Sequence, residues 1–185
     1  MSTNNLNSVT TFMEQLNLRE EVMPLVIEAC SNYPALLESH KDHGQSFQRG
    51  AFECLGEVLR ILKTKKIRDM NSYGCRQLVK ACNEAECFKV NLGWLKPYID
   101  SALAKKDIAE NFHEIERMEQ RIRTLEEELE GKDLKKRIPG ITQEELQKLK
   151  QEELQKLKKD VALKKQGLVD LDIERNLEFP EYSHL

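Results

Sequence analysis

Two stretches in the second half of the chain repeat apolar residues at spacings of three and four among charged residues. They run from Ile108 to Ile138 and from Ile141 to Leu177, and this spacing places apolar side chains on one face of an α-helix. If the two helices fold back on each other, residues that face one another have positions that add to a nearly constant total. The pairs that meet this condition are Leu134 with Leu146, Leu125 with Leu154, Ile122 with Leu157, Met118 with Val161, Phe112 with Leu168, and Ile108 with Leu171. The pattern therefore predicts an antiparallel coiled-coil hairpin.

The residues between these stretches favour a turn at positions 137–142. Pro139 cannot continue a helix interior, and Gly140 readily adopts a left-handed backbone conformation. Thr142 and Glu145 have the spacing of a capping box, in which each side chain bonds a free backbone N–H at the start of a helix. A kinked, extended helix that pairs in parallel with a second chain is the alternative.

The second arm contains a short internal duplication, in which Gln143–Lys150 is repeated at Gln151–Lys158. A repeat of eight residues exceeds a heptad by one and shifts the apolar stripe around the helix. We still expect the apolar residues of this arm to share one broad face. They are Leu146, Leu149, Leu154, Leu157 and Val161.

Residues 1–105 differ from the coil, because they are richer in apolar residues and contain all five cysteines and the one tryptophan. Strand-like alternation is nearly absent, and helical spacing predicts a bundle of four or five helices. The first expected helix begins at a capping box at Thr11–Glu14, and the second covers 21–30 with Pro24 in its first turn. Further helices are expected at 35–39, at 45–63, from 71 or 72 onward, and at 92–103. The predicted fold is all-α, with a helical head at 1–105, a coiled-coil hairpin at 106–177 and a tail at 178–185.

Several residues of the head are candidates for its core. Helix 45–63 carries Phe52, Leu55 and Leu59 on one stripe, and Trp94 and Tyr98 anchor the last helix. Glycine lowers helix propensity, so Gly50 and Gly56 suggest close packing against a neighbour. The helix that begins near 72 is expected to bury Cys75, Leu78, Cys82 and Ala85.

Composition narrows the possible partners and compartments. Charged residues make up 33% of the chain, and the net charge of −3 comes from interspersed signs, which disfavours direct binding of nucleic acid. Five cysteines without a secretory signal favour reduced thiols in the nucleus or cytoplasm. No apolar run approaches the roughly 20 residues of a membrane span. The final Ser183-His184-Leu185 is a loose variant of a peroxisomal address, which leaves that compartment as a minor alternative.

Motifs for catalysis or metal binding are incomplete. Ser46 follows the first glycine of a nucleophile elbow, but the second glycine and the preceding strand are missing. His40 and His43 lack the spacing of a phospholipase D signature. Cys75, Cys82 and Cys87 lack the closely spaced pairs of a structural zinc site. We therefore predict no enzyme activity, no metal and no cofactor.

Two segments of the head carry a family resemblance. Phe52-Glu53-Cys54-Leu55-Gly56-Glu57-Val58-Leu59, followed by Phe88-Lys89-Val90-Asn91-Leu92-Gly93-Trp94-Leu95-Lys96-Pro97-Tyr98-Ile99, resembles the plant "phospholipase-like" PEARLI family. The chain also resembles the coiled-coil module of plant Agenet-associated proteins and the coil of plant MATH-and-coiled-coil proteins. Asn91-Leu92 interrupts the family's K-V-G-W run. The resemblance implies a plant protein and a protein–protein association module that is nuclear and chromatin-associated, and it carries over no catalytic motif.

The leading functional hypothesis is a non-enzymatic adaptor that self-associates as a homodimer and scaffolds a protein partner of unknown identity through helical surfaces. Direct binding of nucleic acid or chromatin is the first alternative, and a lipid hydrolase is the second. The residues expected to form the coiled-coil seam are Ile115, Met118, Ile122, Leu125, Leu129, Leu154, Leu157, Val161 and Leu168.

Overall fold

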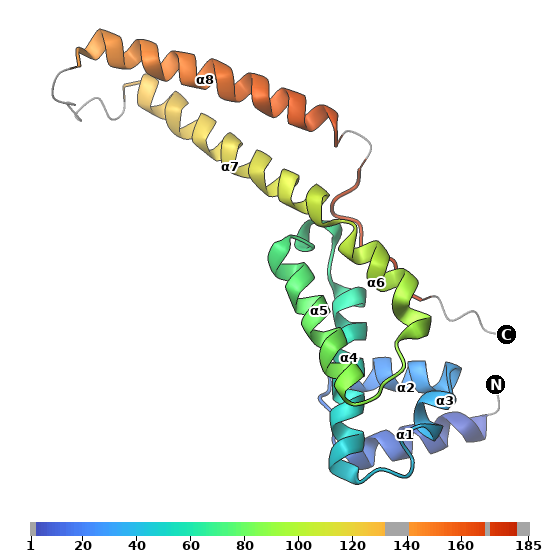
Figure 1. The fold of residues 1–185 in the computed structure, drawn as a ribbon. Helices are drawn as coiled ribbons and strands as arrows, with labels where there is room; N and C mark the ends of the chain where they lie inside the picture. The colour runs from blue at the N-terminus through green and yellow to red at the C-terminus, as the bar shows by residue number, and fades with distance from the viewer. Residues whose placement is uncertain (1–2, 132–140, 169–170, 181–185) are drawn as a thin grey trace. The chain divides into compact units, whose positions relative to one another are not determined.

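The computed structural model describes residues 3–131, 141–168 and 171–180, and these residues form an all-α fold, as predicted (Figure 1). The side chains of residues 3–7 lie outside this description. The α-helices are α1 (Thr3–Leu16), α2 (Met23–Asn32), α3 (Ala35–Glu38), α4 (Gln45–Thr64), α5 (Ser72–Cys87), α6 (Lys96–Leu103), α7 (Lys106–Leu129) and α8 (Gln143–Gln166). Two short 3-10 helices, η1 (Ile67–Asp69) and η2 (Gly93–Leu95), precede α5 and α6.

The chain divides into two compact units. The first, which we call the head, combines residues 1–106 with residues 174–185, and the second, the hairpin, consists of residues 107–173. The sequence-based boundary assigned residues 174–177 to the coiled coil, whereas the structure assigns them to the head. The hairpin is therefore an insertion between two parts of the head.

Helix α4 forms the centre of the head. It packs against α1, α2, α5 and α6, and it buries residues on most of its circumference, as expected for a helix surrounded by others. Phe52, Leu55 and Leu59 are all buried, which confirms the predicted stripe. The predicted start of α5 is also confirmed, because the Asn71 side chain accepts the backbone N–H groups of Tyr73 and Gly74.

The predicted start of the first helix at Thr11 is wrong. Helix α1 begins at Thr3, and Thr11 lies inside it. The buried residues Val9, Met13 and Leu16 follow helical spacing. Val9 lies before Thr11 on this stripe, so the helix extends upstream of the predicted start.

The end of the second hairpin arm is also corrected. The sequence predicted a helix up to Leu177, but α8 ends at Gln166 and the C-cap is Gly167, a residue common after helix ends. Leu171 is 38% exposed, so its predicted pairing with Ile108 does not form part of the seam. The predicted helix over 92–103 is likewise split, since residues 93–95 form η2 and α6 starts at Lys96.

Candidate interaction surfaces

The nine residues that the sequence predicted for the seam lie on α7 and α8, except for Leu168, which follows α8. Four are buried: Ile115, Leu125, Leu154 and Val161. The other five are half-buried: Met118, Ile122, Leu129, Leu157 and Leu168. Two helices alone therefore cover only part of this apolar seam.

Ion pairs between the helices show that they run antiparallel. Lys164 Nζ lies 2.7 Å from Glu114 Oε2, and Lys158 Nζ lies 2.7 Å from Glu126 Oε1, so positions rise along α7 as they fall along α8. The remaining pairs are Lys165 with Glu119, Lys150 with Glu128, and Arg121 with Glu153. All are solvent-exposed to some degree, so they contribute little stability and chiefly favour this pairing of the arms.

The start of α8 has the predicted capping box. Thr142 Oγ1 accepts the Glu145 backbone N–H at 3.2 Å, and the Glu145 carboxylate accepts the Thr142 backbone N–H at 2.9 Å. The bond from the Thr142 backbone N–H, together with one that the Thr142 hydroxyl donates to the Glu145 carboxylate, lowers the pKa of Glu145. The preceding turn residues, Pro139 and Gly140, lie outside the described residues.

Two leucines of α8 face solvent instead of the seam. Leu149 is 53% exposed and Leu163 is 59% exposed, so the prediction that Leu149 shares one face with Leu154 and Val161 is wrong. An eight-residue step advances a helix by about 80° beyond two full turns. The duplicated leucines Leu149 and Leu157 therefore face different directions, and only Leu157 reaches the seam.

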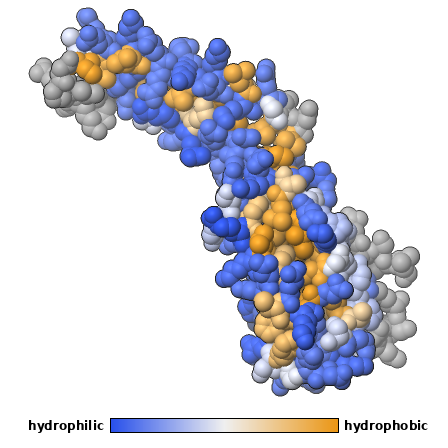
Figure 2. All heavy atoms as spheres, in the orientation of Figure 1, coloured by the Kyte–Doolittle hydropathy of each residue, from blue (hydrophilic) through white to orange (hydrophobic). Residues whose placement is uncertain are grey.

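The head presents a second apolar surface. Figure 2 shows a strip of apolar side chains between α5 and α6. On these helices Val79 is 42% exposed, while Cys82, Ile99 and Leu103 are half-buried. The predicted anchors Trp94 and Tyr98 are also half-buried, and the Trp94 ring lies 4.3 Å from that of Tyr33 between centroids.

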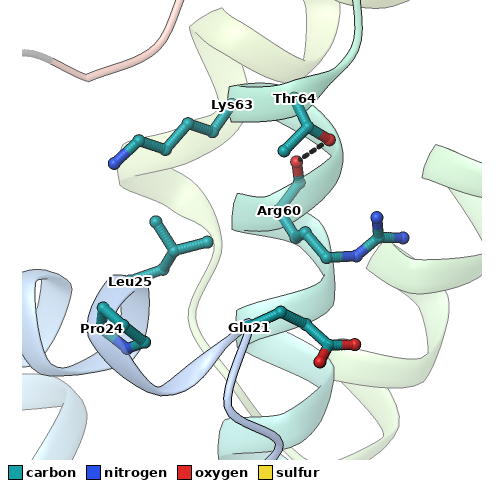
Figure 3. A pocket seen from close by; sticks show the side chains of 6 residues that line it. All are labelled: Glu21, Pro24, Leu25, Arg60, Lys63 and Thr64. Carbon is teal, nitrogen blue, oxygen red and sulfur yellow. Dashed lines mark hydrogen bonds between the residues drawn. The ribbon is translucent and has the colours of Figure 1, made fainter.

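A hollow of about 530 Å3 lies on the head between the start of α2 and the end of α4. It is lined by Glu21, Pro24, Leu25, Arg60, Lys63 and Thr64 (Figure 3). Its cations already have partners, since Arg60 Nη2 lies 2.6 Å from Glu57 Oε1 and Lys63 Nζ lies 5.5 Å from the centroid of the Phe179 ring.

Residues 174–180, which we call the tail segment, lie against the chain that follows α4 (Figure 1). The Ile67 backbone N–H donates to the Arg175 carbonyl at 3.0 Å, and the Leu177 N–H donates to the Lys65 carbonyl at 3.2 Å. Leu177 is 6% exposed. Sequence reasoning missed this contact, because the tail segment is short and lacks the helical spacing of apolar residues that would predict a buried position.

His40 is a second feature that the sequence did not reveal. It was interpreted as a polar loop residue, but it is 1% exposed. Its Nε2 lies 3.0 Å from the Phe88 carbonyl oxygen, and its Nδ1 lies 2.9 Å from Ser39 Oγ and 3.0 Å from the Leu36 carbonyl oxygen. The imidazole thus joins the end of α3 to the end of α5 and stabilises the head.

The thiols do not form a metal site. In the part of the chain that the structure describes, no three His, Cys, Asp or Glu side chains lie close enough to hold an ion. Burial raises the pKa of the Cys30 thiol to about 12 and that of Cys82 to about 11, which keeps both protonated near neutral pH. Ser46 lies exposed in the first turn of α4, where the geometry of a nucleophile elbow is absent.

Among the described residues, no helix combines the length and the apolar character needed to cross a bilayer. Comparison of the chain with protein-family models, with curated proteins and with solved structures finds no match. The resemblance to the PEARLI family therefore stays a prediction.

Proposed function

We propose that this protein is a non-enzymatic interaction module that self-associates through its hairpin and holds a protein partner on its helical surfaces. The observation that carries this proposal is the half-buried state of five seam residues, among them Ile122 and Leu157. Antiparallel helices usually cover such a seam by packing it against further helices. The hairpin of a second copy of this chain would provide these helices.

The driving force for this association is burial of apolar surface. Removing apolar area from water stabilises a contact by about 25 cal/mol per Å2. The acidic and basic residues that flank the seam give the hairpin mixed charge, which favours a defined register between copies. We also propose the chromatin-linked role that the family resemblance implies, and a nuclear or cytoplasmic location.

The apolar strip between α5 and α6 supports a partner site on the head. Exposed and half-buried apolar residues of these two helices, such as Val79 and Ile99, belong to a different unit from the seam. A protein partner on the head and a second copy on the hairpin would therefore use different residues. This separation of two surfaces is the arrangement that an adaptor needs.

Light scattering after size exclusion tests the self-association. We expect the full chain to be a dimer and the variant Ile122→Gln with Leu157→Gln to be a monomer, because polar side chains weaken the seam contact between copies. The variant keeps the four buried seam residues, so circular dichroism should show that the helices remain.

Leu149→Gln with Leu163→Gln is the matched control, because it removes two leucines from α8 that lie outside the seam. We expect this variant to stay dimeric. A seam variant with the same mass as the unaltered chain, or a control that becomes monomeric, would show that the seam is not the contact between copies.

A further inference from the structure

The tail segment docks on the head by backbone pairing, which is the way an added strand binds an exposed edge. Lys66 and Asn176 form an antiparallel β-bridge, flanked by the two hydrogen bonds from Ile67 to Arg175 and from Leu177 to Lys65. We call residues 65–67 the docking edge. Backbone pairing of this kind binds an extended peptide, and side chains then select which peptide fits.

Three side chains of the tail segment supply this selection. The Glu174 carboxylate pairs with Lys66 Nζ at 2.8 Å and also with Arg68 Nη1. Leu177 is 6% exposed, and the Phe179 ring lies beneath the Lys63 ammonium, 5.5 Å from centroid to Nζ. The docking edge, together with the neighbouring Lys63 and Arg68, therefore holds an extended chain that has an acidic residue, a buried leucine and an aromatic residue at fixed spacing.

The tail segment is tied to the rest of the chain through residues without helical structure. Residues 171–173, which precede it, belong to no helix, and the segment joins a unit whose other residues lie before position 107. A second copy of this chain carries the same seven residues and would make the same contacts. Exchange of an identical element in this way is a low-cost route to a dimer.

We propose that the docking edge also binds the tail segment of a second copy, so that two copies exchange residues 174–180. This inference rests on the proposed self-association and adds a contact distinct from the hairpin seam. Within one copy the tail segment is held at high effective concentration, so exchange is expected where copies are already close together or where a copy's own tail segment cannot dock.

Two full-length variants test the exchange. Variant A carries Leu177→Asp, which prevents its own tail segment from docking and leaves its docking edge open. Variant B carries Lys66→Glu with Arg68→Glu, which repel Glu174 and free an unaltered tail segment. In a mixture, the tail segment of B should bind the edge of A, and native mass spectrometry should find A–B dimers above the share expected from random pairing.

The control is variant B with Leu177→Asp added, which lacks a competent tail segment. Because burial of a leucine carries much of the contact, we expect the excess of A–B dimers to fall by about tenfold or more. An A–B share that equals random pairing, or an excess that the control retains, would overturn the exchange. If variant A loses helical structure, Leu177→Ser takes its place in the same experiment.

The two proposals give different results in this mixture. Dimers of A with A and of B with B report the hairpin seam, which both variants keep. Their absence would contradict the seam contact alone, whereas a random share of A–B dimers would contradict the exchange alone.

Discussion

Gly56 of α4 lies where the neighbouring helix leaves no room for a side chain. A Cβ atom built on Gly56 would come within 2.5 Å of the Val22 Cβ, which is fixed close to the backbone. The sequence indicated close packing at this position and at Gly50, and the structure shows the neighbours: Val22 for Gly56, and the Phe88 ring for Gly50, where the nearest approach is also 2.5 Å.

We expect Gly56→Ala to destabilise the head. Overpacking of a core costs about 1–3 kcal/mol, which outweighs the gain of about 1 kcal/mol in helix propensity. Urea denaturation followed by circular dichroism measures the difference. Gly50→Ala should cost less, because the far end of the Phe88 ring can move, and equal losses for the two variants would contradict this reading.

Cys30 and Cys87 should react differently with an alkylating reagent. Burial raises the pKa of Cys30 from 9.0 to about 12, so its reactive thiolate is scarce near pH 9, whereas Cys87 is exposed. Because the pKa of Cys30 is raised in the folded state, the contribution of this thiol to the free energy of unfolding is fully present below pH 9. It is lost as the pH rises toward 12. Mass spectrometry of peptides after iodoacetamide treatment should find Cys87 modified first, and early modification of Cys30 would show that the head opens readily.

At the residue scale, spacing predicted buried positions well where they lie in the middle of long helices. Phe52, Leu55 and Leu59 are examples, because they lie on α4, which packs against α1, α2, α5 and α6. His40 could not be predicted, since its burial depends on carbonyl oxygens of Leu36 and Phe88. Phe88 lies far along the chain, and a backbone carbonyl has no signature in the sequence.

At the scale of the elements, the antiparallel hairpin was predictable because both arms repeat their apolar residues with the same period. The end of α8 was not, because Val161 and Leu168 continue the spacing past Gly167. Helix termination there depends on one glycine, and periodicity extends beyond it. Leu149 was misplaced for a related reason, because a repeat of eight residues turns the stripe.

The capping box of α8 should have a measurable effect on the hairpin. Thr142→Ala removes the hydroxyl that accepts the Glu145 N–H, and loss of such a cap typically costs about 0.5–2 kcal/mol. Amide hydrogen exchange in the first turn of α8 should accelerate, while exchange in α4 of the head stays unchanged. Thr142→Ser, which keeps a hydroxyl, serves as the control and should exchange as the unaltered chain does.

At the scale of the whole molecule, the head needs a segment from the far end of the chain. Removal of residues 174–185 should expose the Ile67 amide, because its acceptor is the Arg175 carbonyl. We therefore expect faster hydrogen exchange at Ile67 and a lower melting temperature for the head. Exchange at Leu59, in the interior of α4, is the internal reference, and an unchanged rate at Ile67 would show that the tail segment does not dock in solution.

This dependence also changes how the head can be isolated. A chain that stops near residue 105, where the sequence placed the boundary, lacks the tail segment. Joining residue 106 to residue 174 through a linker would keep both parts of the head. The sequence could not reveal this, because the evidence for the boundary is a pairing between residues more than a hundred positions apart.

The insertion of the hairpin between two parts of one unit limits how the protein can change in length. Because residues 106 and 174 both belong to the head, both arms are joined to the head at the end away from the turn, and residues gained or lost within one arm must be matched on the other to keep the seam in register. A one-sided change would shift the part of the arm beyond it and separate pairs near the turn, such as Lys150 and Glu128. Lineages that carry this hairpin are therefore expected to vary its length in paired steps, so that a longer or shorter arm comes with an unaltered head.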